Sequence, residues 1–408
     1  MTWAGGVDFL RMIVDSLKLA SDEGAADLVL LVPAIPWRHT MTSLARPWYR
    51  WLSGRYGSRG LAQLRLSLRE QRTVLSPAWQ LDRLRDVLGP EISVIRFGSD
   101  SDIDRLAAKN DISCLLPSIR PLSPDVRTPW IGYIYDFQHR YLEHLFPLAE
   151  RAARDEAFRA MAASGHLVVV NSQAARRDCL RFLGGRQDQF VAFPVGAAPR
   201  PNWLEEDSAV VAKYGLPMHY FVVANQFWRH KNHRLVFEAI QLLGEEGDVV
   251  VVCTGDTRDT HDRSYFPALE QFIQENGLQD RIRILGFIPK RDQIAVMKHA
   301  IAVIQPSNFE GGPGGGAIYD ALSLGVPALV SDIPVNRELE GEAGSIQFFN
   351  PSDARTLASL MLASARTRVT RAEPQTLVQQ GNARQAAVGR VLWAAIRRTI
   401  AGTAPNQA

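Results

Sequence analysis

The chain has 408 residues, of which 46% are hydrophobic and 22% charged, and its formal net charge is +3 at pH 7. This length favours two domains, the composition is typical of a well-packed globular protein, and the small net charge argues against wholesale nucleic-acid binding. The sequence also predicts no membrane span and no signal peptide. Cys114, Cys179 and Cys253 lack disulfide or metal spacing, so we expect unpaired structural cysteines in a reducing compartment.

The first half of the chain predicts strands interspersed with helices. Apolar runs predict strands at 28–32, 92–97, 112–116, 130–135 and 167–171. Apolar residues at helical spacing predict helices at 7–19, 149–163 and 172–183. Gly5 and Gly6 form a turn before the first helix without the strand that a doubly wound domain normally places there. We therefore expect the first strand to be missing or extremely short.

A basic segment between Trp37 and Arg85 holds ten arginines against the two acids Glu70 and Asp82. It also contains Trp and Tyr side chains, and this mixture suits an anionic membrane surface. It would equally suit a phosphorylated acceptor, and a solvated arginine-rich surface is the third interpretation.

The second half shows the strand–helix alternation more clearly. A linker is predicted at 194–217, where Pro199 and Pro201 interrupt regular structure. Predicted strands follow at 220–224, 248–253, 281–285, 301–304 and 328–330. One predicted helix begins at Asn232, and further helices are predicted at 265–275, 291–299, 353–365 and 382–400. Continuous apolar strands alternating with helices predict parallel sheets covered on both faces, in two doubly wound α/β domains facing each other across a cleft.

The segment after residue 304 combines acids with glycines. Glu310 precedes a glycine run, and Asp320 lies on the helical segment that follows it. The glycines of the run are Gly311, Gly312, Gly314, Gly315 and Gly316. Glycines allow close approach of a backbone to a ligand, and a helix start offers N–H groups to an anion. Flanking acids add acceptors for hydroxyls, so the pattern favours a ligand with both features, such as a nucleotide sugar.

Acid, glycines, acid and Gly-x-Pro, in that order, resemble the donor-site signature of the retaining glycosyltransferases of family 4. Further segments at 136–139, 225–233, 286–288 and 331–334, with Gly5-Gly6, resemble the same family, so the resemblance covers nearly the whole chain. It implies the GT-B fold, which consists of two Rossmann-like domains. The implied division is an acceptor-binding domain at 1–198, a linker at 199–217, a donor-binding domain at 218–380, a helix at 381–401 that packs back on the first domain, and a disordered tail at 402–408.

The resemblance also implies roles for individual residues. Glu310 would accept hydrogen bonds from the donor sugar, the glycines of the run would bind its diphosphate, and Asp320 would bind the ribose. Lys231, with Arg229 or Gln226, would face the pyrophosphate, as would the loop containing Gly5 and Gly6. His139 and Asp136 would lie near the acceptor or the reacting carbon.

Two departures from the family pattern stand out. The second acid is an aspartate ten positions after Glu310, where the family usually has a glutamate eight positions on. Gln226 stands where the family often has an arginine. His230 and His233 are interpreted as helix-start residues, and the string Asp100-Ser101-Asp102 as a helix cap rather than a metal site.

The implied activity is retaining, metal-independent transfer of a hexose from a nucleoside-diphosphate sugar, with GDP-mannose and UDP-sugars both open. No cofactor is expected. The acceptor would be a glycan or a lipid-linked glycan in surface polysaccharide or lipopolysaccharide synthesis, and the protein would be cytoplasmic or peripheral at the inner membrane. The alternatives are a nucleotide-sugar epimerase or a phosphorylase of the same fold, and a non-catalytic sugar-binding homologue.

Overall fold

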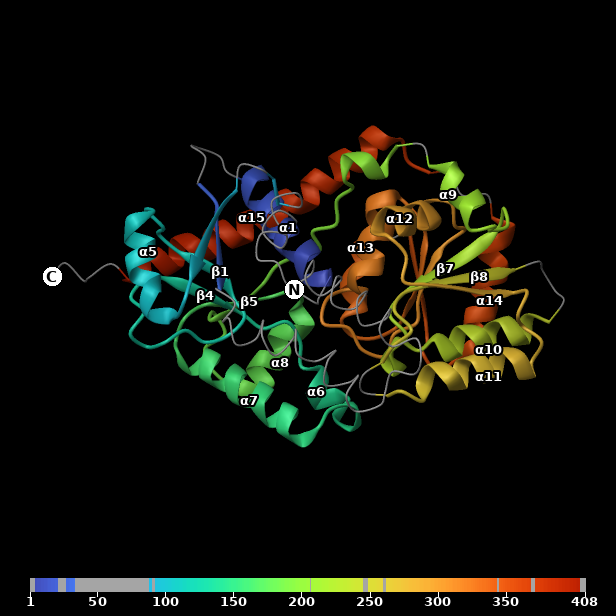
Figure 1. Cartoon of the computed structure of the whole chain (residues 1–408), viewed down its shortest axis with the longest axis horizontal. Helices are drawn as coiled ribbons and strands as arrows, with labels where there is room; N and C mark the ends of the chain where they lie inside the picture. Colours follow the sequence, from blue (N-terminus) through green and yellow to red (C-terminus); the bar gives the residue numbers. More distant parts are fainter. Residues whose placement is uncertain are drawn as a thin grey trace, which may run out of the picture. The chain divides into compact units, whose positions relative to one another are not determined.

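The computed structural model describes residues 4–20, 27–33, 88–89, 92–205, 207–244, 249–259, 262–342, 345–367 and 371–403 (Figure 1). The basic segment between Trp37 and Arg85 lies outside these ranges, so the membrane and acceptor interpretations of that segment stay predictions. The chain divides into two compact units. Unit 1 contains Met1–Leu115 and Leu122–Pro129, and unit 2 contains Leu116–Pro121 and Trp130–Ala408.

Unit 1 begins, among its described residues, with helix α1 (Ala4–Leu19). Gly5 and Gly6 lie in the first turn of this helix and not in a loop ahead of it, which corrects the predicted start at residue 7. Ile13 and Leu17, one helical turn apart, are buried. Leu10 and Val14 pack against the small core around Leu88 and Ile92. These residues form the apolar face by which α1 packs against the rest of unit 1.

Strands β1 (Val29–Pro33) and β2 (Ser93–Phe97) of unit 1 pair in parallel, as expected for the predicted strands. A 3-10 turn, η1 (Asp100–Asp102), then leads into α5 (Ile103–Lys109), which the sequence analysis missed. The Asp102 carboxylate accepts hydrogen bonds from the N–H groups of Gly98 and Ser99, at 2.9 and 3.2 Å. The predicted helix cap at this string is therefore confirmed.

Unit 2 contains two sheets, of which the first has the order β3-β4-β5-β6, with β4, β5 and β6 paired in parallel. Its strands are β3 (Leu115–Ser118), β4 (Trp130–Tyr133), β5 (Val168–Val170) and β6 (Phe190–Ala192). The predicted strand at 112–116 thus begins three residues later, and β6 was not predicted. Its helices are α6 (Gln138–Tyr141), α7 (Leu148–Ala163) and α8 (Gln173–Leu183), and a 3-10 turn, η2, spans Glu143–Leu145.

The second sheet of unit 2 has six strands in the order β12-β11-β10-β7-β8-β9, and the paired strands run parallel. Its strands are β7 (Tyr220–Ala224), β8 (Val250–Thr254), β9 (Ile282–Gly286), β10 (Val303–Gln305), β11 (Ala328–Ser331) and β12 (Ile346–Phe349). The strand order reverses direction at β7, between β8 on one side and β10 on the other. This is the topological switch point at which ligands bind in open parallel sheets.

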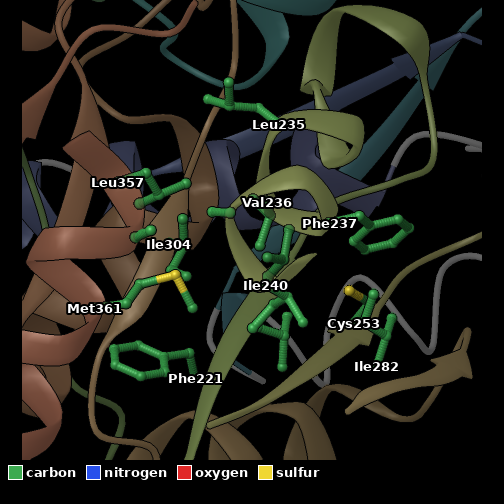
Figure 2. Packing of buried hydrophobic residues seen from close by; sticks show 14 of the residues in the cluster. Phe221, Leu235, Val236, Phe237, Ile240, Cys253, Ile282, Ile304, Leu357 and Met361 are labelled. Atoms are coloured by element: carbon green, nitrogen blue, oxygen red, sulfur yellow. The ribbon is translucent and has the colours of Figure 1, made fainter. Parts of the chain in front are cut away.

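Helices cover both faces of this sheet, as the continuous apolar strands predicted (Figure 1). One face packs against α10 (His233–Leu243), α11 (Tyr265–Glu275) and α14 (Ala354–Arg366), and the other against α12 (Lys290–Lys298) and α13 (Gly315–Leu324). Figure 2 shows the first of these cores, in which Phe221 and Ile304 from the strands meet Ile240 of α10 and Met361 of α14. All four side chains are completely or almost completely buried.

The segment predicted as a linker contains a 3-10 turn, η3 (Pro201–Trp203), and a short helix, α9 (Ser208–Lys213). The last helix, α15 (Pro374–Thr403), begins eight residues before the predicted start at residue 382. It contacts α13 and β4, and the Arg398 guanidinium donates to the Asp188 carboxylate at 3.0 Å. Within the described ranges, no helix is both long and apolar enough to cross a membrane.

Candidate functional site

The candidate site lies at the switch point of the second sheet. The turn after β7 leads through Asn225 into the 3-10 turn η4 (Arg229–Lys231), and the turn after β10 leads into the glycine run. Because β7 and β10 are neighbouring parallel strands, both turns leave the same edge of the sheet. The topology therefore brings Lys231 and Glu310 together across 79 residues of sequence.

Lys231 and Glu310 form an ion pair at the centre of the site. The Lys231 ammonium Nζ lies 2.6 Å from Glu310 Oε1, and the two side chains are only 14% and 8% exposed. The Gln305 amide donates to the same carboxylate oxygen at 3.1 Å. A buried charge is costly unless it is paired, and here the Lys231 ammonium and the Glu310 carboxylate compensate each other.

The glycine run has a backbone that side chains would disturb. Gly314 and Gly315 have φ angles of 67° and 63°, in the left-handed region. A Cβ added to Gly314 would lie 2.5 Å from Ile318 Cβ, and one added to Gly315 would lie 2.7 Å from Glu310 Oε2. Gly316, by contrast, faces open space. The run ends at the N-terminus of α13, whose first N–H groups have no partner within the helix, although the Gly315 N–H donates to the Gly312 carbonyl at 3.1 Å.

A buried network of amide and hydroxyl side chains fixes this loop, and the sequence analysis missed it. Asn336, on the 3-10 segment η5 (Asn336–Glu342), accepts from the Gly314 N–H at 2.7 Å, while Gln305 donates to the Gly314 carbonyl at 2.6 Å. Asn225 donates to Gln305 at 2.5 Å, and Asn336 donates to the Ser331 carbonyl at 2.9 Å. A sequence signal existed, because Gln305 and Ser331 are polar residues that end buried strands.

Asp136 lies beside the glycine run, because the chain that follows β4 passes close to Gly311. A Cβ added to Gly311 would lie 2.7 Å from the Tyr135 carbonyl oxygen and 2.9 Å from Asp136 Cβ. The Ser172 hydroxyl donates to the Gly311 carbonyl at 3.0 Å. These contacts place the predicted catalytic acids Asp136 and Glu310 in one region.

The carboxyl group of Asp136 has a raised pKa. Burial is the main cause, and the negative charge of Glu310 adds to it. The Gln138 N–H donates to Asp136 Oδ1 at 2.9 Å and opposes the shift, as do the charges of Arg154 and His139. A raised pKa in a functional site favours a role in proton transfer or in hydrogen bonding to a hydroxyl group.

His139 lies behind Asp136 with its ring completely buried. Its Nε2 is 2.9 Å from Asp155 Oδ1, and its ring contacts those of Phe137 and Phe158. Burial acts to raise the pKa of Asp155, but hydrogen bonds from His139 and Arg140 outweigh burial and lower it. In this arrangement the imidazole is held by Asp155.

The remaining predicted donor-binding residues have partners or positions of their own. Arg229 pairs with Asp262 at 2.5 Å and lies over the ring of Tyr265, and its side chain is 49% exposed. Gln226 is exposed on the turn after β7. Asp320, buried on α13, pairs with Lys290 of α12 at 2.5 Å. Gly5 and Gly6 belong to unit 1.

The two histidines beside Lys231 occupy the helix-start positions predicted for them. His230 is in η4, and His233 is the first residue of α10. The His233 ring stacks on Phe227, with a centroid distance of 4.1 Å. Burial lowers the pKa of His233 to about 3, and the Lys231 charge acts in the same direction. Over the part of the chain that the structure describes, no three His, Cys, Asp or Glu side chains are grouped so as to hold a metal ion.

Comparison with known proteins gives the class of this domain. Residues 213–368, which contain the second sheet and the whole Lys231–Glu310 site, match the family model described as "Glycosyl transferases group 1". This part of the chain is therefore a group 1 glycosyltransferase domain. The O-antigen chain mannosyltransferase B of Escherichia coli is 26% identical over 206 residues, which cover 49% of this chain and 52% of that protein. The chain thus spans about half the length of this curated relative.

Solved structures share the fold at low sequence identity. HepE of Anabaena, in complex with UDP, has a TM-score of 0.52 and 15% identity, with 92% of this chain and 99% of that chain covered. A glycosyltransferase of Rickettsia africae has a TM-score of 0.55 and 15% identity, covering 94% and 100%. Sucrose-phosphate synthase of Thermosynechococcus elongatus has a TM-score of 0.55 and 17% identity, covering 77% and 85%. The predicted fold class, α/β of the GT-B type, is confirmed.

Proposed function

We propose that this protein is a retaining glycosyltransferase that transfers a hexose from a nucleoside-diphosphate sugar to a glycan or lipid-linked acceptor. The observation that supports this most strongly is the buried pair of Lys231 and Glu310 beside a glycine run at the switch point. The same site offers a cation and a helix N-terminus to a diphosphate, and a carboxylate to sugar hydroxyls. The group 1 glycosyltransferase match over residues 213–368 supports the same conclusion.

In this proposal the donor diphosphate lies against Gly312–Gly316 and the start of α13. Lys231 stabilises the charge that develops on the diphosphate as it leaves, and Glu310 binds hydroxyls of the transferred sugar. The bond between the anomeric carbon and the diphosphate oxygen breaks, and the acceptor oxygen bonds to the same face of that carbon. The acceptor proton passes to the departing phosphate, so no protein nucleophile is required.

The catalytic roles of Asp136 and His139 differ in this proposal. Asp136 lies beside Gly311 and is the acid placed to bind a hydroxyl group of the acceptor or the sugar. His139 has a completely buried ring and acts through its surroundings, because its hydrogen bond with Asp155 fixes the chain after β4. We therefore assign His139 a positioning role.

Metal independence and the choice of donor are part of the same proposal. Lys231 and the helix N-terminus supply positive charge to the diphosphate, and Arg229 would add to it after leaving Asp262. The match to an O-antigen chain mannosyltransferase supports a mannose donor, for which GDP-mannose is the candidate, and a surface polysaccharide as product. The complex of HepE with UDP supports a UDP-sugar instead. Both donors belong in the assay, with EDTA present and absent.

The test measures transfer of label from GDP-mannose and UDP-glucose to a lipid-linked glycan extract. We expect Glu310→Gln to lower transfer by about 100-fold or more, because it removes the carboxylate charge that accepts hydrogen bonds from the sugar hydroxyls. Glu238→Gln is the matched control, because Glu238 also pairs with a cation, Arg234, but at the surface of α10. Glu310→Gln with wild-type turnover and a native melting profile would remove the assignment.

A further inference from the structure

Lys290 forms a second cation–carboxylate pair close to the glycine run. Its Nζ lies 2.5 Å from Asp320 Oδ2. Asp320 lies in the second turn of α13, six residues into the helix that the glycine run begins, and its side chain is 11% exposed. The Lys290 side chain is 35% exposed, so the lysine is the more accessible member of the pair.

The position of Lys290 follows from the fold. It is the first residue of α12, which follows the carboxyl end of β9 in the same parallel sheet. That end of the strand lies at the sheet edge where the turns after β7 and β10 also emerge. The ring of Trp203 lies 5.6 Å from Nζ and limits the directions open to the ammonium group.

The pair offers chemistry that neither side chain offers alone. An ionised carboxylate only accepts hydrogen bonds, and an ammonium group only donates them. Two neighbouring hydroxyls of a ligand both donate and accept, so adjacent carboxylate and ammonium groups suit such a diol. The aspartate is also one methylene shorter than the glutamate that the resemblance led us to expect here, and the longer lysine extends the reach of this position toward solvent.

We propose that Lys290 is a further ligand-binding residue, which together with Asp320 recognises the vicinal ribose hydroxyls of the donor nucleotide. This inference rests on the proposed function, because it places the donor nucleotide at the glycine run and Asp320. It adds a specificity-determining residue that the sequence analysis did not identify. A purely structural ion pair between α12 and α13 would stabilise the fold without distinguishing ribose from deoxyribose.

The chain contains a matched control for that structural role. Lys213 of α9 pairs with Asp292 of α12 at 2.6 Å, and Asp292 is 12% exposed, close to the value for Asp320. Lys213→Met thus removes an ion pair of similar geometry from the same helix α12. Lys290→Arg retains the charge and the donors, and provides a folded variant if Lys290→Met proves unstable.

The experiment is calorimetric titration of the full chain with UDP, GDP and their 2′-deoxy analogues, with the melting temperature of each variant recorded. We expect wild type to bind its ribonucleotide about tenfold more tightly than the deoxy analogue, as for hydrogen bonds to charged groups. Lys290→Met should weaken ribonucleotide binding by about tenfold and bring the ratio near one. Lys290→Arg and Lys213→Met should keep a ratio well above one.

Four results would overturn the inference, and they differ in whether they also remove the proposed function. A wild-type ratio near one, or an unchanged ratio in Lys290→Met, removes the role of Lys290 in ribose recognition and leaves the proposed function standing. A loss of ratio in Lys213→Met as large as in Lys290→Met assigns the effect to general destabilisation. Absence of binding of either nucleotide to wild type removes the proposed function as well.

Discussion

Several ionisable side chains in and around the site are largely buried, and the fold accommodates them in different ways. Glu310 is paired with Lys231, and Asp320 with Lys290, so these carboxylates remain beside cations. The pKa of Asp136 is raised because the effect of burial is larger than the opposing effects of its hydrogen bond and of nearby positive charges. His233 differs from these carboxylates because its ring is buried and stacks on Phe227 instead of pairing with a charge of opposite sign.

The His233 environment predicts a specific acid sensitivity. Because burial lowers the pKa of this histidine from 6.5 to about 3, folding favours the neutral ring. The stabilising contribution is therefore complete above pH 6.5 and is lost as pH falls from 6.5 toward 3. Over that window His233 should cost about 1.4 kcal/mol of unfolding free energy for each pH unit.

His233→Phe should reduce this pH dependence, since phenylalanine can keep the stacking on Phe227 without titrating. The measurement is urea unfolding of wild type and variant at several values between pH 7 and pH 5. His219→Phe changes an exposed histidine and keeps His233, so it should retain the wild-type slope. Equal slopes for wild type and His233→Phe would show that His233 does not control acid stability.

At the scale of elements, the glycine run is a rigid connection between β10 and α13. Gln305 and Asn336 fix the two polar groups of the Gly314 peptide backbone, and Ser172 fixes the carbonyl of Gly311. Such a loop can present N–H groups to a ligand without first having to become ordered. The glycines differ in how strictly this geometry requires them.

Alanine substitutions should separate these glycines. Gly314→Ala should destabilise the protein by about 2–4 kcal/mol, because residue 314 has a positive φ and its Cβ would overlap Ile318. Gly316→Ala should leave stability unchanged or raise it by up to about 1 kcal/mol, because it fills open space in the first turn of α13. Chemical denaturation of both variants measures the difference. Equal losses at the two positions would contradict this description of the loop.

The elements also show what the sequence could and could not predict. Helix α11 was predicted with its observed bounds, Tyr265–Glu275, because Asn276-Gly277 stops it clearly. The short strand β6 and the first turns of α15 were not predicted, although Pro374 marks the observed start of α15. The ion pair of Glu310 with Lys231 and the amide network around Gly314 depend on strand order, which local sequence patterns do not encode.

At the scale of the whole molecule, the domain best characterised by comparison is the one that contains the candidate donor site. The family match covers residues 213–368, and the fold predicted for the chain agrees with that of the similar structures. Sequence periodicity was sufficient for the α/β class because the buried strands of the second sheet are continuously apolar, and the resemblance implied the GT-B type. The site roles and the acceptor remain predictions because they depend on contacts with ligands, and the predicted domain boundaries also remain predictions.

The measurement that tests the central claim most directly is a thermal-shift panel of UDP, GDP, ADP and dTDP with the full chain in EDTA. A nucleotide that binds only the folded protein adds about 2.7 kcal/mol of stability at a hundred times its dissociation constant. We predict that at least one diphosphate raises the melting temperature of wild type, and that Lys231→Met reduces the shift. No shift with any of the four would contradict a metal-independent nucleotide-sugar site at the glycine run.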